Sequence, residues 1–250
     1  MDDYIAFNRE AWNRQVSQGN RWSQPVDEAT VAQARAGAWQ IFLTPTRPLP
    51  RQWLGEAAGK DVLCLASGGG QQGPILAAAG ARVTVFDLSD AQLAQDRRVA
   101  EREGLSLRTV QGDMRDLSCL ADASFDAIVH PVSNVFVDDL APVWRGAFRV
   151  LRPGGRLCAG FMNPVFYLFD WELRAQGQLT ARYPLPYSDL EAGYDTQGAP
   201  LEFSHTLEEQ LGGQMRAGFA LVDLYEDVND PPEALDAYTS SFLATCAVKP

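Results

Sequence analysis

Apolar and polar positions along the chain form blocks that predict strands and helices in alternation. Runs rich in apolar or β-branched residues predict seven strands, at 61–66, 81–87, 105–113, 125–133, 155–163, 219–226 and 240–250. Periodic runs between them predict helices at 73–79, 88–104, 138–151 and 206–217. Because short connections join strand to helix to strand, the pattern predicts an α/β fold with helices on both faces of a mostly parallel sheet.

The first 50 residues precede this alternation and predict two helices. Apolar side chains at Tyr4, Ile5, Trp12 and Val16 can share one helical face, and an alanine-rich run over 27–40 predicts the second helix. Prolines in the segment 44–50 exclude a regular helix or a central strand there, because they fix φ and remove backbone donors. We expect this segment to connect the helices to the sheet.

Residues 164–205 interrupt the alternation after the fifth expected strand. The segment is rich in aromatic and turn-forming residues. It can cover a ligand pocket, with Tyr167, Trp171, Tyr183 and Tyr187 against an acceptor, or it can be a surface excursion with its own hydrophobic cluster. The sequence leaves both interpretations open.

Composition and charge narrow the classes of partner. The chain has 250 residues, of which 46% are apolar, enough for the core of one large domain. Its formal net charge of -11 disfavours nucleic acid and anionic membrane surfaces. The acidic N-terminus predicts no signal peptide, and no run is long enough for a membrane span. Four widely spaced cysteines predict free thiols in a reducing cytoplasm and no metal site.

A glycine-rich turn follows the first expected strand and is the first candidate ligand site. Gly68, Gly70 and Gly73 have the G-x-G-x-x-G spacing, and Asp87 ends the second strand 19 residues after Gly68. A carboxylate there can accept hydrogen bonds from both hydroxyls of a ribose. The same acid can instead cap the helix that begins at Ser89. This turn alone fits a nicotinamide or flavin dinucleotide as well as any other nucleoside.

The residues at the end of the third expected strand help to distinguish between these candidate ligands. It reads Gly112-Asp113-Met114. An acid beside the first two turns can accept from the exocyclic amine of adenine, and Met114 can pack on the ring. With FDAIVHP at 125–131 and RVLRPGG at 149–155, this ordered set has no required role in a dinucleotide enzyme.

Over residues 53–163 the ordered motifs resemble those of the class I S-adenosylmethionine-dependent methyltransferases, and CLASGGGQQGPILAAAGA looks like a small bacterial subgroup of them. The resemblance implies a Rossmann-like, doubly wound, seven-stranded sheet of order 3-2-1-4-5-7-6 with an antiparallel seventh strand. Residues 1–50 would then be a helical lid and connector, 51–163 the cofactor-binding core, 164–205 a covering insertion and 206–250 the end of the sheet, in one domain.

Two positions depart from the family's first motif. Cys64 replaces a common acid, so backbone carbonyls near Ala66 would hold the ligand's ammonium group; Ala66 replaces a glycine, which requires a negative φ there.

The resemblance also implies roles for individual residues toward S-adenosylmethionine. Ser67, Gly68 and Gly70, beside Ala66, would line its methionine part, and Asp87 with Leu88 would hold the ribose and adenine. Asp113 and Met114 would hold the adenine edge. His130 and Asn134, after the fourth strand, would face the sulfonium region.

Methyl transfer is an in-line displacement that needs alignment and exclusion of water, and a base only where the nucleophile loses a proton. His130 is the candidate base, but a packing or hydrogen-bonding role is expected for it ahead of a base role, whereas His205 is expected to cap or bond a loop. Residues 1–25 are expected to form a lid, and at least one of its aromatic side chains, Trp12 or Trp22, is expected to reach the cofactor pocket. The predicted function is methyl transfer to a small molecule. An NAD(P)-dependent oxidoreductase and a non-catalytic nucleoside-binding protein are the alternatives, and no oligomeric state is predicted.

Overall fold

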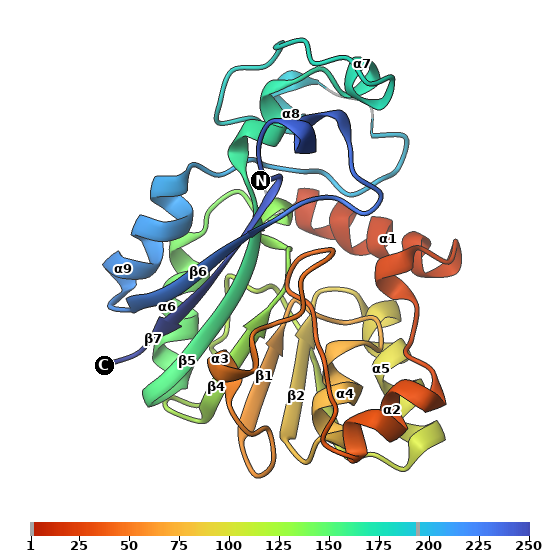
Figure 1. The fold of residues 1–250 in the computed structure, drawn as a ribbon, viewed down its shortest axis with the longest axis vertical. Helices are drawn as coiled ribbons and strands as arrows, with labels where there is room; N and C mark the ends of the chain where they lie inside the picture. Colours follow the sequence, from red (N-terminus) through yellow and green to blue (C-terminus); the bar gives the residue numbers. More distant parts are fainter. Residues whose placement is uncertain (1–2, 194–195) are drawn as a thin grey trace.

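A seven-stranded sheet lies at the centre of the computed structural model, which describes residues 3–193 and 196–250 (Figure 1). The strands are β1 (Asp61–Leu65), β2 (Arg82–Asp87), β3 (Leu107–Gln111), β4 (Phe125–His130), β5 (Leu151–Met162), β6 (Ala220–Asp227) and β7 (Phe242–Val248). Their order is β3-β2-β1-β4-β5-β7-β6. β7 runs antiparallel to both β5 and β6, and the other pairs are parallel. The expected fold and strand order are confirmed.

Helices cover both faces of the sheet. They are α1 (Asp3–Ser17), α2 (Glu28–Arg35), α3 (Arg51–Leu54), α4 (Gln72–Ala78), α5 (Asp90–Glu103), α6 (Ala141–Val150), α7 (Trp171–Ala175), α8 (Asp189–Ala192) and α9 (Gly213–Ala217). Alternate side chains of β1 enter two separate hydrophobic clusters: Val62 and Cys64 pack toward α2 and α4, while Leu63 and Leu65 pack toward α6. A strand buried on both faces explains the uninterrupted apolar run in the sequence.

Three helical segments differ from the expected ones. α2 ends at Arg35 instead of continuing to residue 40, and Gly37 follows it with a φ of +84°. The next residues extend along the sheet and bury Trp39 and Ile41, which gives them an apolar pattern without a helix. The short helix α3 was not expected. The helix predicted over 206–217 is a π-helical turn, η4 (Glu208–Gly212), followed by α9.

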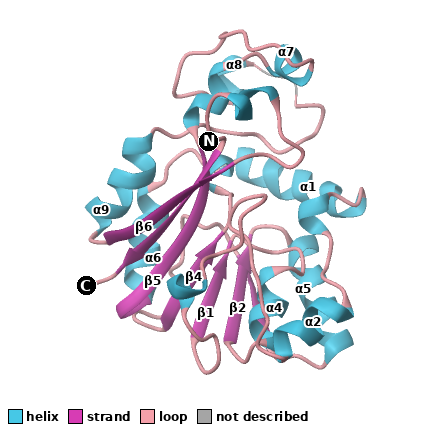
Figure 2. Ribbon diagram, in the orientation of Figure 1, coloured by secondary structure: helices cyan, strands magenta, loops and turns pink. Residues whose placement is uncertain are grey.

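The segment 164–205 forms short helices joined by loops, at the end of the molecule toward which β1 and β2 point (Figure 2). Tyr167 and Tyr187 are buried in a third hydrophobic cluster with Met162 and Phe242, and Trp171 and Tyr183 pack against it. Their rings contact one another; those of Tyr167 and Tyr187, for example, are stacked with centroids 5.7 Å apart. These four aromatic residues therefore support the interpretation of the segment as a unit with its own cluster.

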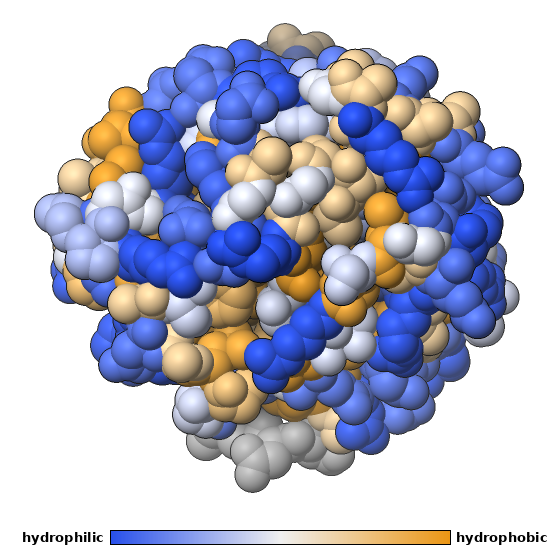
Figure 3. Space-filling model, turned by 90° about the horizontal axis from the view of Figure 1, so that it is seen from below, coloured by the Kyte–Doolittle hydropathy of each residue, from blue (hydrophilic) through white to orange (hydrophobic). Residues whose placement is uncertain are grey.

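The face at the amino ends of the central strands is mostly hydrophilic, with smaller hydrophobic areas between the polar groups (Figure 3). Across residues 3–193 and 196–250, no helix combines the length and the apolar character that crossing a membrane requires.

Candidate functional site

A cavity of about 750 Å³ opens at the carboxyl ends of β1, β2 and β3, where ligands bind in open α/β sheets. Its wall combines the glycine-rich turn with the N-terminal segment and the loop between β6 and β7. Most of the residues predicted to bind the cofactor lie in this wall: Trp12, Trp22, Ala66, Ser67, Gly68, Asp87, Leu88, Asp113 and Met114. The structure therefore brings together residues from four separate parts of the sequence.

Backbone N–H groups of the glycine-rich turn donate to two carboxylates, one partly buried and one fully buried. Gly68 N donates to Asp87 Oδ2 over 2.9 Å, and Gly69 N and Gly70 N donate to Asp96 Oδ2 over 3.0 and 3.1 Å. Asp96 is fully buried on α5. Gly70 thus lies behind the cavity wall, and the prediction that it lines the methionine part is wrong, because its N–H faces Asp96.

The absence of a side chain at Gly73 lets α4 approach this carboxylate. A Cβ atom there would lie 2.6 Å from Val85 Cγ2 and 2.9 Å from Asp96 Oδ1. Any larger residue would displace β2 or the acid that holds the turn. The third glycine of the motif therefore serves the packing of α4 against β2 and Asp96.

Asp87 takes the capping role that its position in the sequence allowed and also lies at the cavity. Its Oδ1 accepts from Ser89 N over 2.9 Å at the start of α5, while Oδ2 accepts from Gly68 N. Burial raises the pKa of Asp87 to about 6, against the lowering effect of these backbone donors. Because the carboxylate also lines the cavity, it is oriented by the protein and can still accept from a ligand.

Ala66 adopts a φ of +47°, so the expectation of a negative φ at this position is wrong. The chain leaves β1 here with Ala66 N donating to Phe86 O over 2.7 Å, and the glycine-rich turn begins at once. An L-residue in the left-handed region costs about 1 kcal/mol, which the hydrogen bonds of the turn must offset. The site therefore keeps the backbone shape that a glycine would give.

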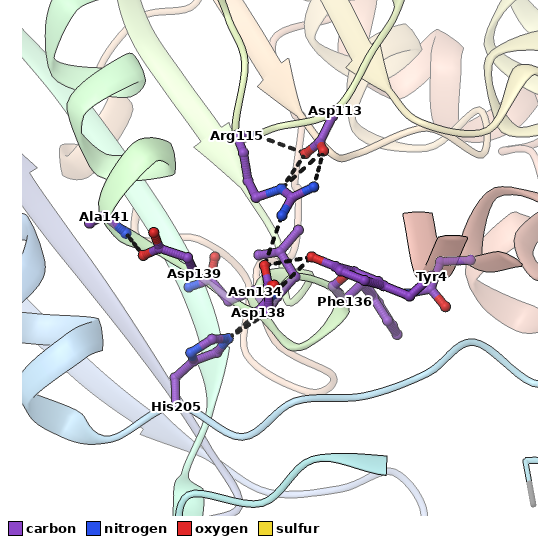
Figure 4. A network of polar contacts seen from close by, with 11 residues as sticks. Tyr4, Asp113, Arg115, Asn134, Phe136, Asp138, Asp139, Ala141 and His205 are labelled. Carbon is purple, nitrogen blue, oxygen red and sulfur yellow. Dashed lines mark hydrogen bonds and ion pairs between the residues drawn. The ribbon is translucent and has the colours of Figure 1, made fainter. Parts of the chain in front are cut away.

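Asp113 belongs to an ionic network that reaches the N-terminal helix (Figure 4). Its carboxylate accepts from Arg115 at Nε over 3.0 Å and at Nη2 over 2.7 Å, and Arg115 Nη1 donates to Asp138 over 2.8 Å. Tyr4 on α1 donates to the same oxygen of Asp138 over 2.6 Å. The network fixes the orientation of Asp113 beside the cavity and ties it to α1.

The N-terminal segment crosses the cavity and is attached on two sides. Trp12 packs edge-on against Phe136, with ring centroids 5.1 Å apart. The 3-10 helix η1 (Arg21–Ser23) carries Trp22, and Arg21 pairs with Asp230 of the β6–β7 loop. Gln71 donates to the carbonyl oxygens of Arg21 and Gln24. These contacts connect the segment directly to the glycine-rich turn.

His130 and Asn134 do not reach the cavity wall. Both are 0% exposed. His130 Nδ1 lies 2.9 Å from the Leu65 carbonyl oxygen and Nε2 lies 2.8 Å from Asn134 Oδ1. Burial lowers the pKa of His130, so the ring is a neutral element of the core that joins β4 to β1. This arrangement corrects the expectation that both residues face the reacting centre and excludes the candidate role of His130 as the base, while the packing and hydrogen-bonding role expected ahead of it is the one observed.

His205 agrees with the expectation of a loop hydrogen bond. It is buried, and its Nε2 lies 3.0 Å from Asn134 O and 2.8 Å from Val137 O. The ring therefore fixes the loop after β4 to the end of the segment 164–205.

Comparison with known proteins shows the family and the fold. Residues 63–159 match a family model described as a methyltransferase domain. The S-adenosylmethionine-dependent methyltransferase of Mesorhizobium loti has the same fold, with a TM-score of 0.61 at 23% identity over 79% of this chain and 94% of that one. The uncharacterized methyltransferase YbaJ of Bacillus subtilis is 48% identical over 256 residues, with 100% of both chains covered. The chain belongs to the methyltransferases. Its fold is that of the class I S-adenosylmethionine-dependent enzymes.

A second solved structure matches nearly the whole methyltransferase. It is the 1,6-didemethyltoxoflavin-N1-methyltransferase of Burkholderia thailandensis, described with 1,6-didemethyltoxoflavin and S-adenosylhomocysteine bound. The TM-score is 0.63 at 20% identity, over 99% of this chain and 89% of that one. The shared fold therefore extends over the N-terminal segment and the segment 164–205.

The donor and acceptor groups of the methyltransferase fit S-adenosylmethionine better than a dinucleotide. In a dinucleotide site the N–H groups of the glycine turn bind a diphosphate. Here Asp87 and Asp96 take up three of those N–H groups, and a phosphate would meet two acids. Hydroxyl, amine and ammonium donors suit this acidic wall, and S-adenosylmethionine carries these without a phosphate.

Sequence reasoning missed three residues of the site. Asp96 lies three residues from both Leu93 and Val99, so the helical period alone places it on the buried face of α5. Gln71 follows the glycines directly, and its polar side chain was a visible candidate. Glu202 lines the cavity from an irregular loop, where no periodic pattern marks it.

Proposed function

We propose that the protein transfers a methyl group from S-adenosylmethionine to a small molecule held between the N-terminal segment and the loops after β4 and β5. The observation that carries this proposal is the shape of the cavity. Its volume lies within the range of about 300–1,000 Å³ that is usual for small-molecule sites. Beyond the nucleoside side its wall includes Val135, Phe136, Met162 and Phe242, all apolar.

The residues of the wall would hold the cofactor in a fixed orientation. Asp87 would accept from the ribose hydroxyls, with Leu88 against the adenine, and Asp113 would accept from the adenine amine beside Met114. Ser67 and Gly68 would contact the methionine part. When bound, S-adenosylmethionine supplies a methyl group on a positively charged sulfur. The contribution of the chain is to align the acceptor with that methyl group and to exclude water.

A small-molecule acceptor agrees with the solved relative that acts on 1,6-didemethyltoxoflavin, itself a small molecule. The negative net charge of the chain supports the same choice over nucleic acid. Trp12 and Trp22 of the N-terminal segment both line the cavity, which supports a small acceptor enclosed by this segment.

Thermal shift and labelled transfer test the proposed function together. S-adenosylmethionine and S-adenosylhomocysteine are each expected to raise the Tm, whereas NADH is not, because ligands stabilise the state that binds them. Methyl-labelled S-adenosylmethionine is then incubated with small-molecule, protein and RNA fractions of a bacterial extract. Label in the small-molecule fraction supports the proposal. Label confined to protein or RNA contradicts the acceptor class, and binding without any transfer indicates a non-catalytic nucleoside-binding protein.

Deletion of residues 1–25 is expected to weaken the binding of S-adenosylmethionine by about tenfold or more, a loss of about 1.4 kcal/mol. The reason is that Trp12 and Trp22 leave the wall and the cavity opens to water. Isothermal titration calorimetry measures the affinity. Trp22→Ala, at a side chain already 43% exposed, keeps α1 in place and should show part of the loss. Tyr238→Ala, at an 80% exposed aromatic outside the cavity, is the matched control. Equal affinity in the deletion variant would refute the lid.

A further inference from the structure

Glu202 places a carboxylate in the cavity from the segment 164–205. Among the described residues of that segment, it is the one that lines the wall. Its neighbours in the chain are held on both sides: Leu201 N donates to Asn8 Oδ1 over 2.7 Å, and Phe203 N donates to Val135 O over 2.7 Å. Asn8 and Val135 also line the cavity. Glu202 is thus fixed where the N-terminal helix, the loop after β4 and this segment meet.

One oxygen of this carboxylate is anchored and the other is available. Tyr167 donates to Oε2 over 2.7 Å, and Tyr167 is itself held in the aromatic cluster at 1% exposure. The backbone N–H of Glu202 donates to Asp189 Oδ2 over 2.7 Å, which fixes the main chain as well. Across the part of the chain that the structure describes, no residue donates a hydrogen bond to Oε1. The anchored geometry gives the side chain one free acceptor toward the cavity.

The surroundings of Glu202 give it the proton affinity of a general base. Burial is the main cause that raises its pKa to about 7; the nearby Asp189 also acts to raise it, while the Tyr167 hydroxyl and Arg174 act to lower it. A base is most effective when its pKa lies near the working pH, because it is then ionised and still binds a proton. Glu202 meets this condition, whereas His130 is enclosed in the core.

We propose that Glu202 is the catalytic residue that accepts the proton of the methyl acceptor, and that the acceptor is a largely apolar molecule with an O–H or N–H nucleophile. This inference rests on the proposed function. The apolar character follows from the side chains that share the wall with Glu202, among them Phe136, Met162 and Phe242. An anchored carboxylate among such side chains recognises one polar hydrogen and rejects acceptors without it.

The proposed step balances in atoms and charge. The lone pair of the acceptor oxygen or nitrogen forms a bond to the methyl carbon, and the carbon–sulfur bond breaks with its electron pair remaining on sulfur. The acceptor proton passes to Oε1 of Glu202. The products are the methylated acceptor, S-adenosylhomocysteine and a protonated Glu202, which returns the proton to water after release.

The test compares Glu202→Gln with the wild type and with Glu172→Gln, an exposed glutamate of the same segment outside the cavity. Transfer to the small-molecule fraction is measured from pH 5.5 to 9. Glu202→Gln is expected to lower kcat by about 100-fold or more, because general-base catalysis contributes about that much. Its affinity for S-adenosylmethionine in calorimetry should stay within about twofold of the wild type, and Glu172→Gln should match the wild type in both measurements.

Tyr167→Phe tests the anchor and supplies a readout that a merely structural role would not move. Removing the hydroxyl leaves the ionised carboxylate without its donor, so the acid limb of the pH–rate profile should shift to higher pH. The carboxyl signal of Glu202, observed by ¹³C NMR with S-adenosylhomocysteine present and assigned with Glu202→Gln, should titrate near 7 in the wild type and higher in Tyr167→Phe.

The outcomes separate this inference from the proposed function. Failure of the wild type to bind S-adenosylmethionine would overturn both. Binding and transfer with unchanged kcat and pH profile in Glu202→Gln would overturn the role of Glu202 alone. Titration of Glu202 near the ordinary value of about 4.3 would also overturn it, as would a labelled product whose acceptor atom carried no hydrogen.

Discussion

Replacing Asp87 with asparagine is expected to weaken the binding of S-adenosylmethionine by about 100-fold or more. Both oxygens of Asp87 already accept from backbone N–H groups, of Gly68 and Ser89, so an amide must turn its NH2 group toward one of these donors. The substitution also removes an acceptor from the ribose. Hydrogen bonds to charged groups contribute about 1.5–3 kcal/mol, and a loss of about 3 kcal/mol toward the ribose corresponds to roughly 100-fold in affinity.

Isothermal titration calorimetry with S-adenosylhomocysteine checks this prediction, and Glu101→Gln, on the exposed face of α5, is the control. The pH dependence provides a second check. The ionised carboxylate is the stronger acceptor for hydroxyl groups, so affinity should decrease as the pH falls through about 6, the pKa to which burial raises Asp87. Unchanged affinity in Asp87→Asn at neutral pH would contradict the assignment of Asp87 to the ribose.

Replacing Asp96 with alanine is expected to lower the free energy of unfolding by about 2–5 kcal/mol, because Gly69 N and Gly70 N each lose their buried acceptor. Asp96→Asn should be much less harmful, since an amide oxygen can accept both bonds. Urea unfolding measures the effect, with Glu101→Ala as the control on the same helix. Equal stability of Asp96→Ala and the control would show that the turn does not depend on this acid.

The stability of the wild type should also depend on pH through Asp96. Burial and the nearby Asp87 raise its pKa to about 8, so the folded state holds this proton more firmly than the unfolded chain. The stabilising contribution is therefore complete below the unfolded pKa near 3.8 and is lost as the pH rises toward 8. The Asp96→Asn variant has no such proton to lose. As the pH rises from 5 to 8, its free energy of unfolding should therefore increase relative to that of the wild type.

The sheet could be predicted because each central strand is buried on both faces, which leaves a continuous apolar run such as 61–66. The resemblance of the ordered motifs then gave the strand order. The end of α2 at Arg35 could not be predicted in the same way. Trp39 and Ile41 are apolar because they pack against the sheet, and an apolar pattern of this kind does not require a helix. The π-helical turn before α9 lies against Trp144, whose Nε1 donates to Glu209 O over 3.0 Å, and the local sequence does not record this distant contact.

The site was predictable where its residues follow strands directly, as Asp87 and Asp113 do, because the carboxyl ends of parallel strands meet at one edge. His130 follows the same rule in sequence, yet its side chain turns into the core, and a sequence position does not specify that direction. Glu202 lies in a loop whose position is set by a hydrogen bond to Asn8, 193 residues away. No local pattern records such a contact.

The N-terminal helix α1 touches both ends of the cavity. The Tyr4 hydroxyl donates a hydrogen bond to Asp138, which belongs to the ionic network of Asp113. The Asn8 side chain donates to the carbonyl oxygens of Phe136 and of Leu201, the residue before Glu202. Displacing α1 would therefore loosen the nucleoside side and the acceptor side in one movement. Ligand exchange and assembly of the reactive arrangement then share a single gate. An enzyme built in this way would complete turnover only as fast as that helix can leave and return, and each ligand would influence the residence time of the other through the position of α1.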